Sequence, residues 1–583
     1  MTSFVVIVAY LSLLLILGFI SSRFFRGTSK DYFVASHSIG PFLLLMSVFG
    51  TTMTAFALVG STGKAFERGI GVYGLMASSS ALVHAAVFFW VGIKLWAIGK
   101  RHGYVTQIQF FRARFESTGL GYLLFPILVG LVIPYLLIGV MGAAKVILPA
   151  TAGAFPQAFP NEGTPFAGGI PFWLTGLGVC AVVLSYIFAG GSRATAWANT
   201  FQTLFFMGMG LVAFCAIAHG LGGLRAASRV PLTVTPAGEV VQTHRIDPET
   251  HAVVERESPL KVGRLVHPDP PAQAVQPHLS RRRYAVTFER TDPQSGEAVL
   301  LTREIGVPPL MFLTYFLIPL SVGMFPHIFQ HWLTARSAGS FRLTVVAHPI
   351  CIMIVWVPCV LIGVWASGLL PPTLSTSAVL SVMLQQLVGN PILGGLLTAG
   401  VLAAIMSSLD SQFLCMGTIF TNDIVLHRAP QDRFSDRQII FMSRAFIVGI
   451  VTITYALAML ALAKNVNIFD LAVWSFSGFT SLFPLIVAAL YWKRATRAGA
   501  YASVVAAMVV WFYYFWRSGF GGEYTVSVGS WRGIMPVTLS FAASALMLVL
   551  VSLGTRPPSQ ATINRFFFEH SMGLSATGDG NEE

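Results

Sequence analysis

A polar stretch inside an apolar segment decides the fold of this chain: Leu402-Ala403-Ala404-Ile405-Met406-Ser407-Ser408-Leu409-Asp410-Ser411. The surrounding segment, 392–420, is long enough to cross a bilayer as a helix. Spacings of i, i+3, i+4 and i+7 place four small or hydroxyl residues on one face of that helix: Ala404, Ser407, Ser408 and Ser411. Two neighbouring hydroxyls at this depth predict a site for a small hard cation, which prefers oxygen ligands. The alternative is that these residues only allow close helix packing.

The composition of the whole chain is that of an integral membrane protein. Its 583 residues are 55% hydrophobic and only 10% charged, with a mean hydropathy of +0.70. Because soluble chains carry about 25% charged residues, most of this surface must be solvated by a lipid bilayer. The net charge of +13 would suggest a nucleic-acid partner in a soluble domain. Here cytoplasmic loops rich in Lys and Arg explain it, so we expect no nucleic-acid binding.

Thirteen apolar segments, each about 20 residues or longer, predict thirteen transmembrane helices. They cover 3–22, 39–63, 70–98, 119–148, 171–191, 195–220, 307–332, 341–366, 392–420, 438–463, 469–491, 499–516 and 534–553. Lys and Arg concentrate in the alternate loops that are cytoplasmic if the N-terminus lies outside. We therefore expect a multi-pass protein of the plasma (inner) membrane, with the N-terminus outside and the C-terminus in the cytoplasm.

One polar segment, 225–306, does not fit the apolar pattern. With the N-terminus outside, this segment lies on the extracytoplasmic side of the membrane. Two stretches within it, 239–257 and 284–304, alternate apolar and polar residues on either side of turn sequences. This pattern predicts a small β-rich insert of one or two hairpins, and the alternative is a disordered loop, favoured by the proline-rich stretch 267–278.

Two of the apolar segments are interrupted near their centres. Segment 39–63 carries Gly50-Thr51-Thr52-Met53-Thr54, and segment 307–332 carries Pro319, Ser321, Gly323 and Pro326. These segments are second and seventh in order, so each begins a group of five successive helices. Because five is an odd number, the two groups must have opposite orientations in the membrane. Interrupted helices at matching positions of two inverted halves indicate a transporter binding site, because they free carbonyls and helix ends at the midplane.

The predicted fold is therefore all-α and polytopic, with about thirteen transmembrane helices and two inverted five-helix repeats, helices 2–6 and 7–11. We divide the chain into an extra helix plus the first repeat, the β-rich extracytoplasmic insert, the second repeat, two accessory helices and a cytoplasmic tail. The corresponding ranges are 1–224, 225–306, 307–491, 492–555 and 556–583.

Several of these motifs resemble the sodium:solute symporter family, and the similarity covers residues 1–555 apart from the insert. The most specific match is the stretch 402–411, continuing to Asn422-Asp423-Ile424. Weaker matches are Gly60…Gly63…Ala65-Phe66…Gly69, Gly190-Gly191…Ala196-Trp197…Gln202 and Pro326-His327…Gln330. The resemblance implies a leucine-transporter-type inverted-repeat fold and sodium-coupled uptake of a small organic solute by alternating access.

The resemblance also implies a set of site residues. The sodium ion (Na+) would be held by the backbone carbonyls of Gly50, Met53 and Ala404 and by the hydroxyls of Ser407 and Ser408. Further candidates for solute binding or coupling are Thr51, Thr52, Thr54, Pro319, Ser321, Gly323, Asp410, Ser411 and Asn199. Asp410 is notable as the only carboxylate in the interior of a predicted span.

The chain departs from the family pattern at positions that bear on the cargo. Asn199 stands where many members carry an acidic residue on the proposed sodium exit path. Sugar-transporting relatives carry amide and carboxylate groups where this chain has Phe56, Ala57 and Met76, so a sugar is disfavoured. Helix N-termini at the two breaks instead favour a carboxylate-bearing solute.

Two other functions compete with a symporter. A solute sensor without net transport is one, although residues after 555 are too few for an output domain. An enzyme is excluded because Ser407 has no nearby histidine in its helix, and His327 and His331 are expected at an interfacial helix end.

Lys64 ends a stretch that resembles part of a phosphate loop, and we expect it to be a solvated outer residue. The oligomeric state and the identity of the solute are not determined by the sequence.

Overall fold

A computed structural model provides the three-dimensional structure. It describes residues 1–567 apart from short gaps at 24–26, 36–37, 161–165, 368, 371–373, 429–432, 465 and 530. Between residues 228 and 297, only the β-strands are described.

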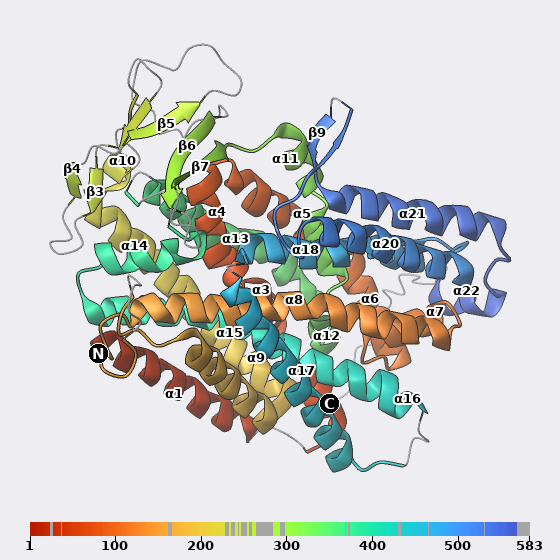
Figure 1. Ribbon diagram of the computed structural model, residues 1–583. Coiled ribbons are helices and arrows are strands. Elements are labelled where there is room, and N and C mark those ends of the chain that lie inside the picture. Colours follow the sequence, from red (N-terminus) through yellow and green to blue (C-terminus); the bar gives the residue numbers. More distant parts are fainter. Residues whose placement is uncertain are drawn as a thin grey trace, which may run out of the picture.

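Long apolar helices dominate the described part of the chain (Figure 1). Ten of these helical segments are long and apolar enough to cross a membrane. They are α1 (Thr2–Ser22), η3 to α6 (Gly74–His102), α8 (Thr118–Ala150), α9 (Phe172–Gly220), η7 with α13 (Ala338–Ala366), α15 to α16 (Pro391–Arg428), α17 (Asp436–Ala463), α18 with α19 (Ile468–Tyr491), α20 (Arg497–Arg517) and α21 (Pro536–Gly554). This confirms the prediction of a polytopic all-α membrane protein.

Two further spans are bent pairs of helices, and they coincide with the two interrupted segments. In the first pair α3 (Pro41–Thr52) meets η2 (Phe56–Gly60) and α4 (Ser61–Arg68) at 57°. In the second pair α11 (Pro309–Tyr315) and η6 (Ile318–Gly323) meet α12 (Pro326–Thr334) at 50°. Counting each pair as one span gives twelve.

The long helix α9 also contains a break. Gly191 has φ 54° and ψ −142°, a conformation that side-chain-bearing residues rarely adopt, and a Cβ there would lie 2.6 Å from the carbonyl oxygen of Tyr32. The break separates the fifth and sixth apolar segments of the sequence. The number of thirteen spans stays a prediction, because it requires both parts of α9 to cross separately.

Local sequence explains where the two bent pairs break. Met53 is extended, with φ −90° and ψ 101°, and the hydroxyl of Thr54 accepts a hydrogen bond from the Phe56 N–H (3.0 Å), which starts the next half-helix. In the second pair Pro326 occupies the first turn of α12, and proline disfavours a helical conformation in the preceding Phe325, which has φ −65° and ψ 118°. Both breaks are therefore built into the sequence.

The two bent pairs run in opposite directions. Ile39, at the start of the first pair, exchanges backbone hydrogen bonds with the end of the second, donating to Thr334 (3.0 Å) and accepting from Arg336 (2.9 Å). At the other end, the N–H of Gly306 donates to the carbonyl of Arg68 (2.8 Å). Each pair thus begins where the other ends. Two inverted repeats require this geometry, although the assignment of helices 2–6 and 7–11 to repeats stays a prediction.

Strands within 232–305 form a small β-rich unit at one end of the helices (Figure 1). A five-stranded antiparallel sheet has the order β1-β2-β5-β6-β7, and β3 pairs with β4. The strands are β1 (Leu232–Val234), β2 (Glu239–Gln242), β3 (His244–Ile246), β4 (Val253–Glu255), β5 (Pro259–Gly263), β6 (Tyr284–Thr291) and β7 (Ala298–Ile305). The hairpin predicted in 284–304 is β6–β7, and the turn near 247–249 falls between β3 and β4.

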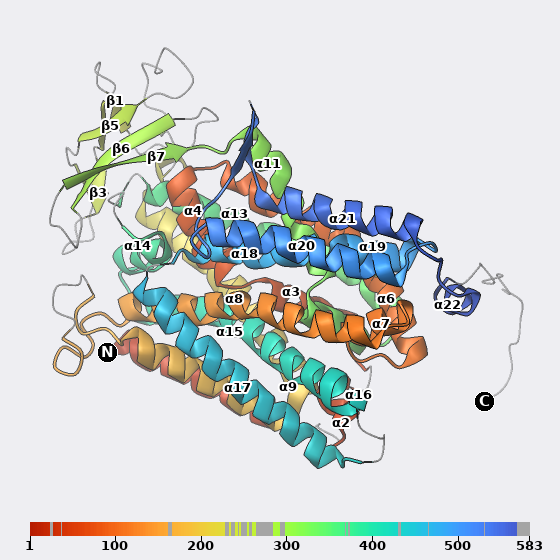
Figure 2. The same ribbon diagram turned by 45° about the vertical axis from the view of Figure 1, so that its right-hand side comes forward.

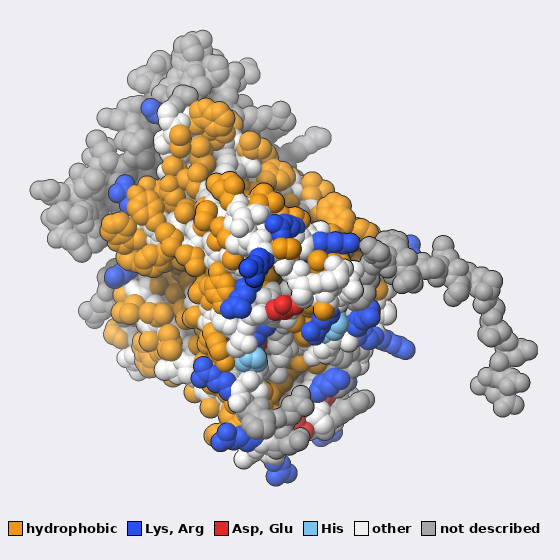
Figure 3. All heavy atoms as spheres, turned by 90° about the vertical axis from the view of Figure 1, so that its right-hand side faces the viewer, with side chains coloured by type: hydrophobic (Ala, Val, Ile, Leu, Met, Phe, Trp, Pro, Cys, Tyr) orange, Lys and Arg blue, Asp and Glu red, His pale blue; other side chains and the backbone are white. Residues whose placement is uncertain are grey.

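The N-terminus and the sheet lie at the same end of the helices, together with α14 (Val379–Leu387). The short helices α7 (Gln107–Arg114), α16 (Leu426–Arg428) and α22 (Gln560–Phe566) lie at the other end (Figure 2). That second end faces the viewer in Figure 3 and gathers many Lys and Arg side chains. Exposed basic residues here include Lys100, Arg101, Arg428, Lys493 and Arg497.

We predict that the insert can be removed without loss of the helical fold. Replacing residues 232–303 with a short Gly-Ser linker should leave a monodisperse protein whose melting temperature stays within a few degrees of the parent, because the insert enters the fold through a surface connection. Size-exclusion chromatography and thermal unfolding measure this. Aggregation of the shortened protein would show that the insert is part of the core.

Candidate sodium and solute site

The serine-bearing face of α15 meets the first broken helix. Ser407 is fully buried, and its Oγ lies 2.9 Å from the carbonyl oxygen of Gly50 and 2.9 Å from that of Ala404. Because Met53 and Thr54 are not helical, the carbonyl of Gly50 lies at the end of α3, where helical amides are missing. Three of the five predicted sodium ligands therefore meet at one point.

Gly50 is required by the close approach of a third helix. A Cβ built on Gly50 would lie 2.3 Å from Oγ1 of Thr203, 3.5 Å from the carbonyl oxygen of Asn199 and 3.7 Å from Cβ of Ser407. The Thr203 hydroxyl also donates to the carbonyl of Met46 (3.1 Å). The break in α3 is thus enclosed by α15 on one side and by the second part of α9 on the other.

Ser408 points away from this junction. Its Oγ accepts a hydrogen bond from Nε2 of Gln412 (2.7 Å), and the Tyr135 side chain of α8 lies within hydrogen-bond reach. Ser408 and Ser407 therefore contact different helices, although they are neighbours in sequence. A role for Ser408 as a sodium ligand requires its hydroxyl to exchange the Gln412 amide for the ion.

Asp410, Ser411 and Asn199 form a second polar cluster, one turn further along α15. Asp410 accepts a hydrogen bond from the hydroxyl of Tyr186 (2.9 Å), and Ser411 lies 3.0 Å from Nε2 of His331. With the Asn199 amide oriented so that its nitrogen faces Asp410 (2.9 Å), its oxygen accepts from Ser411 Oγ (2.9 Å). Asp410 thus faces α9 and not the sodium junction, so it is placed to act through Asn199 and Ser411.

The second break has its own hydroxyl partner. Thr480 of α18 donates to the carbonyls of Leu317 (3.2 Å) and Ile318 (3.0 Å), just before the turns that hold Pro319, Ser321 and Gly323. This matches Thr203, which serves the first break from the sixth predicted helix, whereas Thr480 lies on the eleventh. The correspondence is what a twofold relation between two five-helix repeats would produce.

Aromatic side chains fill the space between the two breaks. Tyr135 of α8 packs against Phe325 and His327 of the second break, at ring-centroid distances of 5.3 and 5.7 Å. Phe476 of α18 contacts Tyr135 (4.9 Å) and also Phe56, which follows the first break (5.1 Å). These contacts connect both breaks through a largely apolar centre.

Two hydroxyls of the first break differ in their partners. Thr52 donates to the carbonyl of Phe49 (2.8 Å) and lies 3.3 Å from Nε2 of His348. The Thr51 hydroxyl is buried and has no hydrogen-bond partner among the described residues. Thr51 and Thr52 therefore remain candidates for polar contact with a solute.

Two expectations about exposure are wrong. His327 and His331 are not interfacial, since they are only 1% and 7% exposed, and both ring nitrogens of His327 lack a hydrogen-bond partner among the described residues. Lys64 is not solvated but 2% exposed. The helix α12 is only nine residues long and ends within the protein, so its histidines never reach the surface. Carboxylates distant in sequence surround Lys64 and make its burial possible.

The fold and the site together are typical of a membrane transporter built around two discontinuous helices. A profile of the sodium:solute symporter family matches residues 32–507, so the chain belongs to the sodium:solute symporter family. This confirms the family predicted from the sequence, classes the chain as a transporter and not an enzyme, and makes sodium its coupling ion.

Curated relatives include sodium/proline symporters. That of Escherichia coli is 24% identical over 96% of this chain and 94% of its own length, and sodium/proline symporter 2 of Staphylococcus saprophyticus is 22% identical over 95% and 93%. A high-affinity proline transporter of Bacillus subtilis is 28% identical over 33% of this chain, and this match spans only 38% of the relative. Other matches of this kind likewise span about a third of the relative.

A solved structure supports the fold. A Na+-coupled sialic acid symporter in a substrate-bound outward-open state superposes with a TM-score of 0.65 at 16% sequence identity, over 96% of this chain and 99% of that one. At this identity the likeness concerns the fold alone, and it agrees with the leucine-transporter-type architecture predicted above.

The sodium junction can be tested with single hydroxyl deletions. We predict that Ser407→Ala raises the sodium concentration needed for half-maximal thermal stabilisation by about tenfold, because one oxygen ligand is lost. Ser408→Ala should have a smaller effect, and Ser185→Ala, which removes an exposed hydroxyl of α9, should have none. Sodium titrations of melting temperature on purified protein measure this, and equal curves for Ser407→Ala and Ser185→Ala would contradict the site.

The close approach at Gly50 makes a second prediction. Gly50→Ala should lower stability by about 1–3 kcal/mol, because the new methyl group overlaps Oγ1 of Thr203. Adding Thr203→Ala removes that oxygen and should recover a large part of the loss, although the hydrogen bond to Met46 is given up. Chemical or thermal unfolding of the four proteins completes this double-mutant cycle, and additive losses would contradict the proposed overlap.

Proposed function

We propose that this protein is a sodium-coupled symporter that moves a small carboxylate-bearing solute by alternating access. The observation that carries the proposal is the contact of Ser407 with the carbonyl of Gly50, which brings a hydroxyl from α15 to the break in α3. A hard cation prefers such oxygen ligands, and in lipid only a helix break leaves backbone carbonyls available.

Sodium would take the position where these oxygens converge. The carbonyls of Gly50, Met53 and Ala404 would supply three ligands, and the hydroxyls of Ser407 and Ser408 would supply two. Ser407 already lies within 2.9 Å of two of these carbonyls, so small movements would open the space for an ion. Ser408 would turn its lone pairs from Gln412 toward that ion.

Coupling would follow from a shared backbone segment. Sodium bound at Gly50 and Met53 would order the break, and the same segment presents Thr51, Thr52 and Thr54 to the solute. Pro319, Ser321 and Gly323 would shape the opposite wall. The solute then meets a completed pocket only when sodium is bound. The sodium-bound state would therefore bind the solute more tightly than the sodium-free state.

The polar groups between the breaks favour a carboxylate. The N-terminus of α12 begins at the second break and carries partial positive charge. His327 lies on its first turn, and its ring nitrogens have no partner in the part of the chain that the structure describes. Phe56, Ala57 and Met76 are buried and apolar, so the many hydroxyls of a sugar would find few partners. A zwitterionic amino acid such as proline, the cargo in the names of several relatives, is the first candidate.

Basic side chains indicate the orientation in the plasma membrane. The end of the molecule with α7, α16 and α22 carries clustered Lys and Arg (Figure 3), as cytoplasmic ends do. The N-terminus and the β-rich insert, at the opposite end, would then lie outside (Figure 2). The domain ranges given above stay a prediction.

The alternative is a transporter-like sensor that binds solute without moving it. Both functions predict sodium-dependent binding, and only a symporter predicts accumulation.

Reconstituted protein separates these possibilities. We expect proline or another small carboxylate to raise the melting temperature only in the presence of sodium, and the same compound to accumulate in proteoliposomes under an inward sodium gradient. Potassium in place of sodium, and Ser407→Ala, serve as controls. Binding without accumulation would favour the sensor, and accumulation independent of sodium would overturn the proposal.

A further inference from the structure

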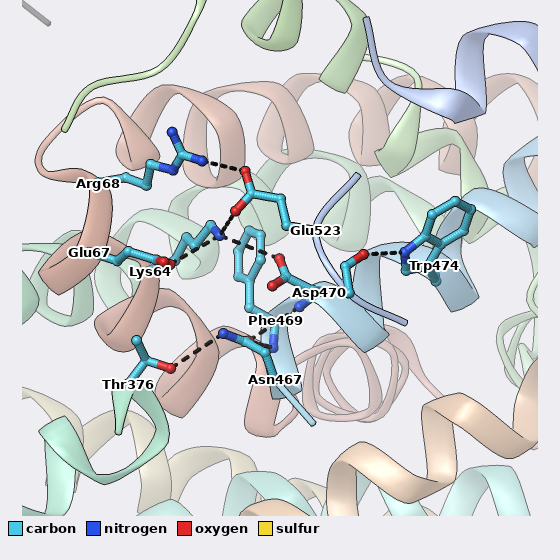
Figure 4. Close-up of polar contacts among 10 residues, drawn as sticks. Lys64, Glu67, Arg68, Thr376, Asn467, Phe469, Asp470, Trp474 and Glu523 are labelled. Atoms are coloured by element: carbon cyan, nitrogen blue, oxygen red, sulfur yellow. Dashed lines mark hydrogen bonds and ion pairs between the residues drawn. The ribbon is translucent and has the colours of Figure 1, made fainter. Parts of the chain in front are cut away.

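A buried lysine lies outside the sodium and solute site. Lys64 is on α4, the half-helix that follows the first break, and only 1% of its side chain is exposed. Its Nζ lies 2.7 Å from Glu523, 3.1 Å from Glu67 and 3.4 Å from Asp470 (Figure 4). An ammonium group this deep requires paired carboxylates, so the contacts are essential to its position.

The carboxylates come from three different parts of the chain. Glu67 belongs to α4 itself and Asp470 to the first turn of α18. Glu523 lies in the connection between α20 and α21, the two accessory helices outside both predicted repeats. Glu523 also accepts from Nη2 of Arg68 (2.5 Å), so both cations of α4 contact the same carboxylate.

The accessory connection is itself held in place. Nε1 of Trp474, on α18, donates to the carbonyl of Gly522 (2.8 Å), next to Glu523 (Figure 4). Burial raises the pKa of the Glu523 carboxyl, but Lys64 and Arg68 more than offset this and hold the pKa below its ordinary value. Glu523 is therefore an ionised and fixed anchor for α4.

The half-helix α4 is joined to a hinge. Met53 and Thr54 are non-helical, and the residues after them form the π-helical turn η2 before α4 begins. In the first turn of α4, Gly63 packs against the backbone of Thr376, where a Cβ would lie 2.3 Å from the carbonyl oxygen. A pivot at the break would therefore separate α4 from both Thr376 and Glu523.

A small pocket lies beside the ion pairs, on the side of the carboxylates. Its volume of about 30 Å³ is room for about one water molecule, and it is lined by Asp470, Glu523, Trp474, Tyr524 and Met535 among others. The cluster has three carboxylates and two cations, so opening would return charged groups to water. Hydration would then offset part of the lost pairing.

We propose that Lys64 and Glu523 form an ionic latch that holds α4 against α18 and the accessory connection, closing the outer path to the solute pocket. The inference rests on the proposed alternating-access function. Lys64 and Glu523 are positioning residues, since they set the orientation of α4 and through it the break that carries Gly50. The accessory helices α20 and α21 acquire a role in transport as the fixed side of the latch.

Distances between two spin labels, measured by pulsed electron paramagnetic resonance, test the latch without knowledge of the solute. Spin labels at Ile70→Cys, just after α4, and Ser527→Cys, in the accessory connection, are placed in the full chain with its five native cysteines replaced. Glu523→Gln should increase the ratio of long to short distances by about tenfold, the size expected for a lost charge-assisted hydrogen bond. Arg532→Gln, an exposed charge in the same connection, should leave the distribution unchanged.

Arg68→Gln is the second variant, and it decides the question if Glu523→Gln does not fold. A purely structural role would lower the melting temperature of both variants without lengthening the distance, and that result would overturn the latch. Sodium is then added alone to the labelled parent. If sodium changes neither the distances nor the melting temperature, the proposed sodium coupling is wrong. The distances of the parent and the variants without sodium still show whether the latch exists.

Discussion

The structure depends on one constraint, that backbone carbonyls freed inside a membrane must find partners within the protein. A broken helix at mid-membrane is tolerated only where other helices or a cavity satisfy its polar groups. Ser407 serves the carbonyl of Gly50, which lies at the end of α3. The hydroxyls of Thr203 and Thr480 bind carbonyls in the turns that lead to the two breaks. The packing of α9, α15 and α18 around the two breaks follows from this requirement, and so does the placement of the proposed sodium site.

The two breaks are equivalent in geometry but not in chemistry. They run antiparallel and are tied together at both ends by backbone hydrogen bonds involving Ile39 and Gly306. The first break meets the hydroxyl face of α15, which suits an ion that needs oxygen. The second meets Tyr135, Phe476 and the imidazole of His327, which has no hydrogen-bond partner within the described ranges, and this suits a small organic molecule. The first break would still touch both ligands, since Thr51 and Thr52 follow Gly50 directly, and the latch at Lys64 would control access from the outer side of that segment.

Much of the fold could be predicted from local pattern, because each feature depends on residues near one another in the chain. Apolar length set the membrane segments, Gly50 and Pro326 marked the breaks, and alternating residues marked the β6–β7 hairpin. The partners of Lys64 could not be found this way, since Asp470 and Glu523 lie more than 400 positions away. The spacing of Lys64 and Glu67 was a local signal of an ion pair, but such pairs are common on solvated helices.

The sequence by itself determined that this chain is a polytopic membrane protein with two discontinuous helices and a hydroxyl stripe at mid-membrane, because lipid restricts which residues can occupy a span and in what order. Only the tertiary structure decided which hydroxyl meets which carbonyl. Ser407 and Ser408 are neighbours in sequence, yet the rotation of α15 points one at Gly50 of α3 and the other at Tyr135 of α8. Helix rotation and the approach of distant segments arise from packing over the whole chain, and no local pattern encodes them.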